Sequence, residues 1–176
     1  MLSIFFIGVA LSMDAFSIAV SLGMNEMSSL KRLLIPSVVG VMHFIMPMLG
    51  LILGNKLFSI FNINSKFIVS IILLYLAILM FMDRNKESKQ KITSIFSIFL
   101  FAFSVSIDSF SVGIGLSGLT DKYIIASTIF ALCSASITYI GLLLGKYSVE
   151  LLKDKAIYLG ICILVILAIV NICQIF

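Results

Sequence analysis

The sequence predicts an all-α, polytopic membrane protein with six transmembrane helices arranged as two inverted three-helix repeats. Hydrophobic residues make up 61% of the 176 residues and charged residues only 11%, far below the roughly 25% charge of an ordinary soluble domain. Six apolar runs are long enough to cross a bilayer, and a short motif with a central Asp occurs once in each half of the chain. The composition therefore excludes a soluble domain, and the motif divides the chain in two.

The six runs are expected to be helices. A hydrocarbon core of roughly 30 Å takes about 20 helical residues, or about 17 at the short end. Backbone polar groups cannot remain unpaired in lipid, and the runs lack the alternation of barrel strands. The expected spans are Leu2–Gly23, Leu33–Gly54, Phe67–Met82, Thr93–Leu116, Tyr123–Gly145 and Ala156–Phe176.

Taken in order, the runs differ in what they carry. No Lys or Arg precedes the first run, which exceeds the apolar core of a signal peptide, so we expect it to remain as a span. It contains Asp14, the second run contains His43 and Pro47, and the third is the shortest. The fourth contains Asp108, the fifth ends in a glycine-rich stretch, and the sixth contains Asn171.

Lys and Arg in the loops predict the orientation, because cytoplasmic loops carry an excess of both. The first, third and fifth loops hold nine of the twelve basic residues, whereas the second and fourth hold Lys56, Lys66 and Lys122. We therefore expect a cytoplasmic-membrane protein with its odd-numbered loops in the cytoplasm and both termini outside. Because the charges sit in short loops and form no surface patch, nucleic-acid binding is not expected.

The two halves of the chain repeat in sequence. Ser12-Met13-Asp14-Ala15-Phe16 matches Ser106-Ile107-Asp108-Ser109-Phe110, and Gly50–Gly54 matches Gly141–Gly145. Three spans per repeat is an odd number, so the second copy must enter the membrane from the opposite side, and an inverted repeat places its binding site near the midplane. We divide the chain into a first repeat (1–82), a cytoplasmic linker (83–92) and a second repeat (93–176).

Asp14 and Asp108 are the two acidic residues that lie inside apolar runs. A carboxylate at the bilayer centre costs roughly 2.5 to 3.5 kcal/mol on insertion scales and is by default a functional-site candidate. Helical spacing puts Ser17 on the face of Asp14 and Ser111 on the face of Asp108. Carboxylate and hydroxyl oxygens suit Mn²⁺, Mg²⁺ or Ca²⁺ better than thiolate-seeking metals, and two Asp residues would neutralise one divalent cation.

His43, the single histidine, lies on a stripe of small residues in the second span. As a borderline ligand it would favour Mn²⁺, Fe²⁺ or Zn²⁺ over Mg²⁺. The alternative is a packed histidine bonded to a carbonyl of a neighbouring helix, and the sequence leaves both open. Pro47 is expected to kink the helix and free a carbonyl. The candidate metal ligands are Asp14, Asp108, Ser17, Ser111 and His43.

These residues favour an exporter of a divalent cation. Taking a +2 ion out against 100 mV, inside negative, costs roughly 4.6 kcal/mol, so export needs a driving gradient, and proton exchange on the two Asp residues is the simplest one. Two other classes stay open: an exporter of a small organic cation such as a basic amino acid, and a non-transporting scaffold. An enzyme is least favoured because no Ser/His/Asp or metalloprotease motif is present.

The chain resembles the small bacterial manganese efflux pump family. The resemblance covers essentially the whole chain and rests on the two Asp motifs, on Pro47-Met48-Leu49-Gly50, and on Lys155-Ala156 followed by Leu159-Gly160. It implies Mn²⁺ export across the cytoplasmic membrane, with Asp14 and Asp108 as the main functional carboxylates. Three positions depart from the family pattern, where acidic or amide residues or glycines are usual: His43, Ala77 and Ala168.

The resemblance also implies the partners. Mn²⁺ or a related divalent cation is expected as the transported substrate, with no permanent cofactor. The other expected partner is the lipid bilayer. A monomer and a homo-oligomer both stay open.

Overall fold

The structure is a computed structural model, and it describes residues 2–25, 27–61, 65–83, 94–117, 120, 122–146, 158, 161–166, 168–170 and 173. Within these residues all regular structure is helical. Residues at 158, 161–166, 168–170 and 173 are helical as well. The expected all-α fold is confirmed, with helices α1 (Leu2–Gly23), α2 (Ser29–Phe61), α3 (Ser65–Asp83), α4 (Ile95–Leu116) and α5 (Tyr123–Gly145).

The helix boundaries follow backbone hydrogen bonding more than apolarity. α1 and α5 have the expected bounds, but α2 begins before Leu33 and continues past Gly54. Ser28 accepts a hydrogen bond from the Lys31 backbone N–H at 3.4 Å, so the polar first turn is helical. α4 starts two residues later than expected, because Ser94 and Ser97 cap each other's backbone N–H groups in a capping box.

Four of the expected spans are helices long and apolar enough to cross a membrane, by length and composition. They are α1, α4, α5 and the Ser29–Leu57 part of α2. In the third and sixth spans, the described residues give shorter apolar helices, Ser70–Leu79 and Ile161–Val170. Many large apolar side chains are exposed on the outside of the bundle, Ile95 by 80% and Phe96 by 72%, as expected of a surface that faces lipid. The helices therefore fit a membrane protein, and the count of six spans stays a prediction.

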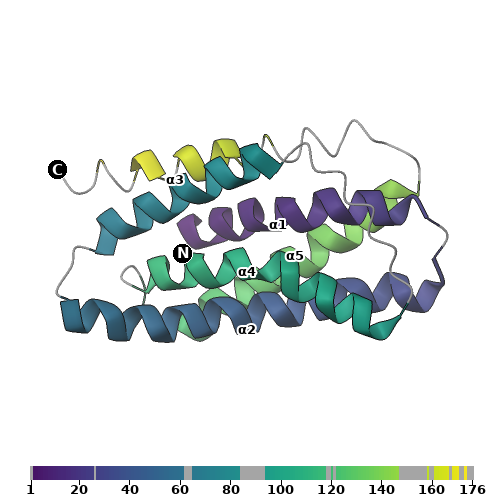
Figure 1. Cartoon of the computed structure of the whole chain (residues 1–176), viewed down its shortest axis with the longest axis horizontal. Helices are drawn as coiled ribbons and strands as arrows, with labels where there is room; N and C mark the ends of the chain where they lie inside the picture. The colour runs from purple at the N-terminus through teal and green to yellow at the C-terminus, as the bar shows by residue number, and fades with distance from the viewer. Residues whose placement is uncertain are drawn as a thin grey trace.

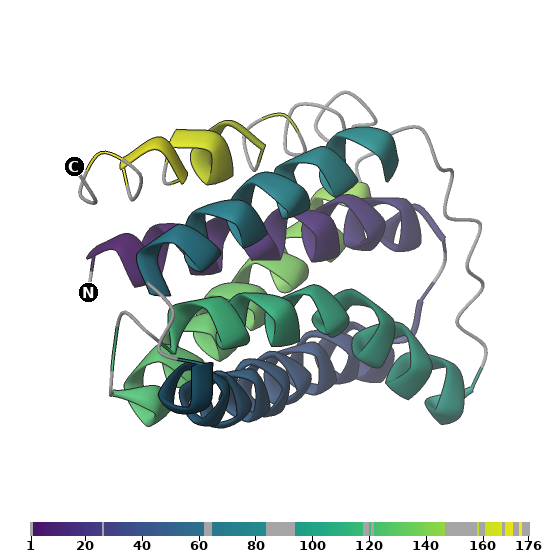
Figure 2. The ribbon, with the colours of Figure 1, turned by 60° about the vertical axis from the view of Figure 1, so that its left-hand side comes forward.

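The helices pack side by side in one bundle. α2 lies along both α4 and α5, and α1 lies along α5. α1 and α4 run in opposite directions, as do α2 and α5 (Figure 1). Both views show the C-terminal helical residues beside α3 (Figures 1 and 2).

Two apolar clusters, which also include residues of other helices, each contain residues of both α1 and α4. The first joins the beginning of α1, with Ile7 and Leu11, to the end of α4, with Val112 and Leu116. The second joins the end of α1 to the beginning of α4, through residues 15–22 and 98–105. The stretches between the clusters, 12–14 and 106–111, therefore lie at a similar depth in the bundle.

Glycines let the helix backbones touch at two seams. A Cβ on Gly50 of α2 would meet the Phe110 carbonyl of α4, and a Cβ on Gly113 would meet the Pro47 carbonyl. At the α1–α5 seam, a Cβ on Gly145 would meet the Val20 carbonyl. Small residues at helix interfaces permit this approach.

The two seams use matching positions of the sequence repeat. Gly50 of α2 contacts Phe110 of α4, whereas its counterpart Gly141 contacts Phe16 of α1. Each of these phenylalanines lies two residues after a motif Asp. The contact pattern of one seam thus recurs in the other.

Candidate metal site

Asp14 and Asp108 lie near the middle of α1 and α4, and both are partly buried. The serine two residues before each Asp is bound to its own helix: Ser12 Oγ donates to the Gly8 carbonyl at 2.6 Å, and Ser106 Oγ donates to the Phe103 carbonyl at 3.0 Å. Such bonds satisfy a hydroxyl inside an apolar helix. The hydroxyls of the motif serines are therefore satisfied within their own helices, and the carboxylates are the ionisable groups of the motif.

Neither Asp lies on a glycine seam. At 3.6 residues per turn, Asp14 is roughly half a turn from the α1 residues that contact α5, and Asp108 is roughly half a turn from the α4 residues that contact α2. Ser17 is buried and Ser111 is partly buried. The residues that make the seam contacts are Gly8, Phe16, Ala19, Val20 and Gly23 in α1, and Phe110, Gly113, Ile114 and Ser117 in α4.

The structure brings the candidate ligands together only in part. The register of α1 against α4 places Asp14 and Asp108 at a similar depth. Among the described residues, however, no group of three His, Cys, Asp or Glu residues is arranged to hold a metal ion. His43 therefore does not complete a three-residue centre with the two carboxylates here.

His43 is almost fully buried, with 1% of its surface exposed. Its Nδ1 lies 3.0 Å from the Val39 carbonyl. Because a carbonyl only accepts, Nδ1 carries the proton, and Nε2 presents a lone pair. This Nε2 is buried with no hydrogen-bond partner in the described part of the chain. Metal-binding histidines commonly have this arrangement, in which one ring nitrogen donates to a carbonyl and the other is free to bind.

The backbone around His43 adds an oxygen. α2 continues through Pro47, and Pro47 has no N–H to donate to the carbonyl four residues earlier. That carbonyl belongs to His43. The carbonyl that the sequence predicts to be freed is thus that of His43, the residue with the unpartnered Nε2. The kink itself stays a prediction.

A set of buried hydroxyls lies on α5. Ser127, Ser134 and Thr138 have no exposed surface, and their oxygens have no partner among the described residues. Spacings of seven and four residues put them on one helix face. Gly40 of α2 packs on this part of α5, where an added Cβ would lie 3.0 Å from that of Ala135.

These hydroxyls matter because an unsatisfied buried polar group costs about 1 to 3 kcal/mol. Water or an ion would satisfy them. The sequence shows Ser134 and Thr138 as a polar face of the fifth span, but only the packed structure shows that their oxygens lack partners.

Together, the apolar helices and the carboxylates inside them define a helical membrane protein of the class in which intramembrane charge serves transport. The chain belongs to the family described as "Putative manganese efflux pump", whose model matches residues 26–172. The resemblance noted from the motifs is confirmed.

Several Bacillus proteins named "Putative manganese efflux pump MntP" are similar to the chain. One from Bacillus cereus (strain B4264) is 35% identical over 159 residues, covering 89% of this chain and 87% of the relative. Those from Bacillus mycoides (strain KBAB4) and Bacillus thuringiensis (strain Al Hakam) are each 35% identical over 158 residues, with the same coverage. No solved structure matches the chain.

Proposed function

We propose that this protein exports Mn²⁺ across the cytoplasmic membrane and that Asp14 and Asp108 bind the ion during transport. The observation that carries the proposal is the pair of carboxylates, one in each half of the chain, at a similar depth in two helices that run in opposite directions (Figure 1). Membership of a manganese efflux pump family supplies the identity of the ion.

The chemistry of the surrounding groups supports a hard divalent ion. Ser17 and Ser111 add hydroxyl oxygens on the faces of the two Asp residues, and oxygen ligands suit Mn²⁺. His43 Nε2 and its freed carbonyl offer one nitrogen and one oxygen. Because His43 does not complete a centre with the carboxylates, we propose that it binds the ion at a separate point on the path, next to the hydroxyl face of α5.

We propose that the two halves form an inverted repeat whose relative movement exposes the ion to either side. Support comes from the opposite directions of α1 and α4 and from the matching contacts of Gly50 and Gly141. Inverted repeats bind their substrates between the copies and alternate access by moving one against the other. The orientation, with odd-numbered loops in the cytoplasm, rests on the distribution of Lys and Arg.

Export against the membrane potential needs energy, and we propose that protons supply it. The same carboxylates that release Mn²⁺ outside would take up protons there and return them to the cytoplasm. Carboxylates that share a site avoid repulsion by holding either a cation or protons. One Mn²⁺ for two protons would balance the charge of the two Asp residues.

The test is manganese content and tolerance in cells that lack their own exporter. Wild type should lower cellular manganese and restore growth at high manganese, and Asp14→Asn or Asp108→Asn should abolish both effects. Asp83→Asn, at the end of α3 and outside the apolar runs, is the charge-matched control and should retain them.

Two outcomes would contradict the proposal in different ways. If well-inserted wild type leaves manganese unchanged, the metal is wrong, and an organic cation becomes the better candidate. If both Asn variants export like wild type, the carboxylates only bond to neighbouring helices, as in a scaffold, because an amide retains much of that bonding.

A further inference from the structure

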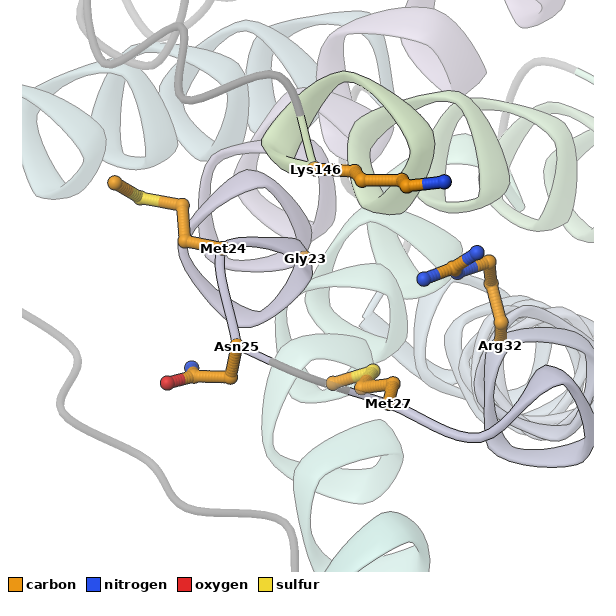
Figure 3. A pocket seen from close by; sticks show the side chains of 6 residues that line it. All are labelled: Gly23, Met24, Asn25, Met27, Arg32 and Lys146. Carbon is orange, nitrogen blue, oxygen red and sulfur yellow. The ribbon is translucent and has the colours of Figure 1, made fainter.

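A cavity of about 420 Å³ lies at one end of the bundle, away from the two Asp residues. It is formed where α1 ends, α2 begins and α5 ends. Gly23, Met24, Asn25, Met27, Arg32 and Lys146 line it (Figure 3). This is the end of the bundle that carries the first loop, which the basic residues predict to be cytoplasmic.

Next to the cavity, the end of α1 is in close backbone contact with α5. A Cβ on Gly23 would meet the carbonyl of Leu142, and a Cβ on Gly145 would meet the carbonyl of Val20. α1 therefore rests directly on the last turn of α5, and Lys146 follows immediately. The position of Lys146 beside the end of α1 is thus fixed by packing.

Two cations extend into the same part of this cavity. Figure 3 shows the charged ends of the Arg32 and Lys146 side chains on the same side of the cavity. Like charges at close range repel. None of the described acidic residues lines the cavity, and Arg32 Nε is buried without a partner in the described part of the chain.

The position of Arg32 at the N-terminus of a helix is also electrostatically unfavourable. Arg32 lies in the first turn of α2, which holds no acidic residue. The N-terminus of a helix carries a partial positive charge and favours an anion. A basic side chain there is unfavourable unless an anion joins it. The positive-inside rule explains why Lys and Arg occur at this end, but it does not explain a buried guanidinium nitrogen without a partner beside a second cation.

We propose that this cavity binds a phosphate group, held by the guanidinium of Arg32 and the ammonium of Lys146. The planar fork of Arg matches phosphate oxygens, and such charge-assisted bonds are about twice as strong as neutral ones. Met27 adds an apolar side chain to the lining, whereas the side chains of Met24 and Asn25 point away from Arg32 and Lys146 (Figure 3). The phosphate comes either from an anionic phospholipid or from a soluble phosphate compound.

The experiment separates these two sources. The purified full chain is examined by native mass spectrometry with phosphatidylglycerol, and in parallel its thermal unfolding is followed by far-UV circular dichroism as inorganic phosphate is added. Neither measurement contains manganese, so neither depends on the transport proposal. Arg32→Gln and Lys146→Gln should each weaken binding by about tenfold, the effect expected for one charged hydrogen bond.

Lys31→Gln is the matched control, because it removes one positive charge next to Arg32 from a residue that does not line the cavity. It should bind like wild type. Lys146 is exposed at the end of α5, so its variant is expected to fold even if Arg32→Gln does not.

Retention of phosphatidylglycerol without an effect of inorganic phosphate would identify a lipid site, and the reverse would identify a soluble ligand. Equal weakening by Lys31→Gln, or no weakening by either lining variant, would overturn the proposal. Glu26 lies outside the described residues, so Glu26→Gln is tested as well. Binding that appears only in that variant would also overturn the proposal, because a carboxylate of the chain would then already occupy the site.

Discussion

His43 carries one group that the packed structure leaves without a partner among the described residues, the ring Nε2, and its carbonyl is the one that Pro47 has no N–H to bond. The bond from Nδ1 to Val39 at 3.0 Å fixes which nitrogen has the lone pair. Of the two interpretations that the sequence allows, the packed histidine is expected to bond to a carbonyl of a neighbouring helix, whereas the bond seen is to Val39 of its own helix. The open Nε2 therefore favours the ligand.

His43→Gln tests this at the residue scale. Gln keeps a neutral polar side chain but removes the imidazole, so we expect the KM for Mn²⁺ transport in inside-out vesicles to rise about tenfold or more, as for other losses around metal sites. Zn²⁺ and Fe²⁺ transport should fall further than Mg²⁺ transport, because imidazole favours the former ions.

Thr128→Ala is the control for His43→Gln. Thr128 is an exposed α5 residue whose hydroxyl donates to the Ile124 carbonyl at 2.7 Å, so its loss should leave KM unchanged. An unchanged KM in His43→Gln, together with lower thermal stability, would show that His43 only packs.

Some of the site residues could be predicted from the sequence, and others could not. Asp14 and Asp108 could be singled out because charge inside an apolar run is costly wherever the helices pack. The partners of Ser12 and Ser106, the bond to Val39 and the unpartnered hydroxyls of α5 depend on rotamers and on helices distant in the chain, which no local pattern contains.

At the scale of elements, the glycine seams hold the helices at the distance of backbone contact. Gly50→Ala should destabilise the protein by about 1 to 3 kcal/mol, the usual cost of overpacking, because the added methyl would meet the backbone of α4. The measurement is thermal unfolding in detergent by far-UV circular dichroism.

Gly8→Ala is the matched control for that substitution. Its methyl would lie 2.9 Å from Cδ1 of Phe130, a side-chain atom and not a backbone atom, so the cost should be smaller. Equal losses in the two variants would mean that the glycines matter through helix propensity and not through the close approach of α2 to α4.

Helix boundaries could be predicted from the sequence where the apolar run and the helical hydrogen bonding end at the same residue. α1 and α5 have the bounds that their apolar runs indicate. α2 does not, because its polar first turn is capped by Ser28 and its helix continues beyond Gly54. The length of an apolar run is set by the thickness of the hydrocarbon core. A helix, however, ends where its backbone groups form hydrogen bonds outside the helix.

At the scale of the whole molecule, the orientation is predicted by the loop charges. After removal of Cys133, Cys162 and Cys173, a cysteine at Lys122 should react with a membrane-impermeant maleimide in intact cells, whereas one at Asn25 should react only after permeabilisation. Both positions are exposed, and they precede α5 and follow α1. The cysteine-free protein is the control, and the opposite labelling pattern would invert the proposed orientation.

The stoichiometry of exchange can be argued from the two carboxylates. If each Asp releases its share of one Mn²⁺ and takes one proton, two positive charges cross in each direction and the cycle is electroneutral. The membrane potential then makes no contribution to the free energy of export. Without this exchange it would oppose export by roughly 4.6 kcal/mol per ion at 100 mV. Each unit of pH gradient is worth about 1.4 kcal/mol per proton, so one unit should sustain roughly a hundredfold manganese gradient.

Proteoliposomes test this directly. An imposed pH gradient should drive Mn²⁺ transport, whereas a potassium diffusion potential set with valinomycin should leave the rate unchanged. Asp108→Asn should give no Mn²⁺ transport under the same pH gradient, because one Asp cannot balance the ion. Transport that follows the potential would require a different number of protons, and transport indifferent to both gradients would mean that protons do not drive export.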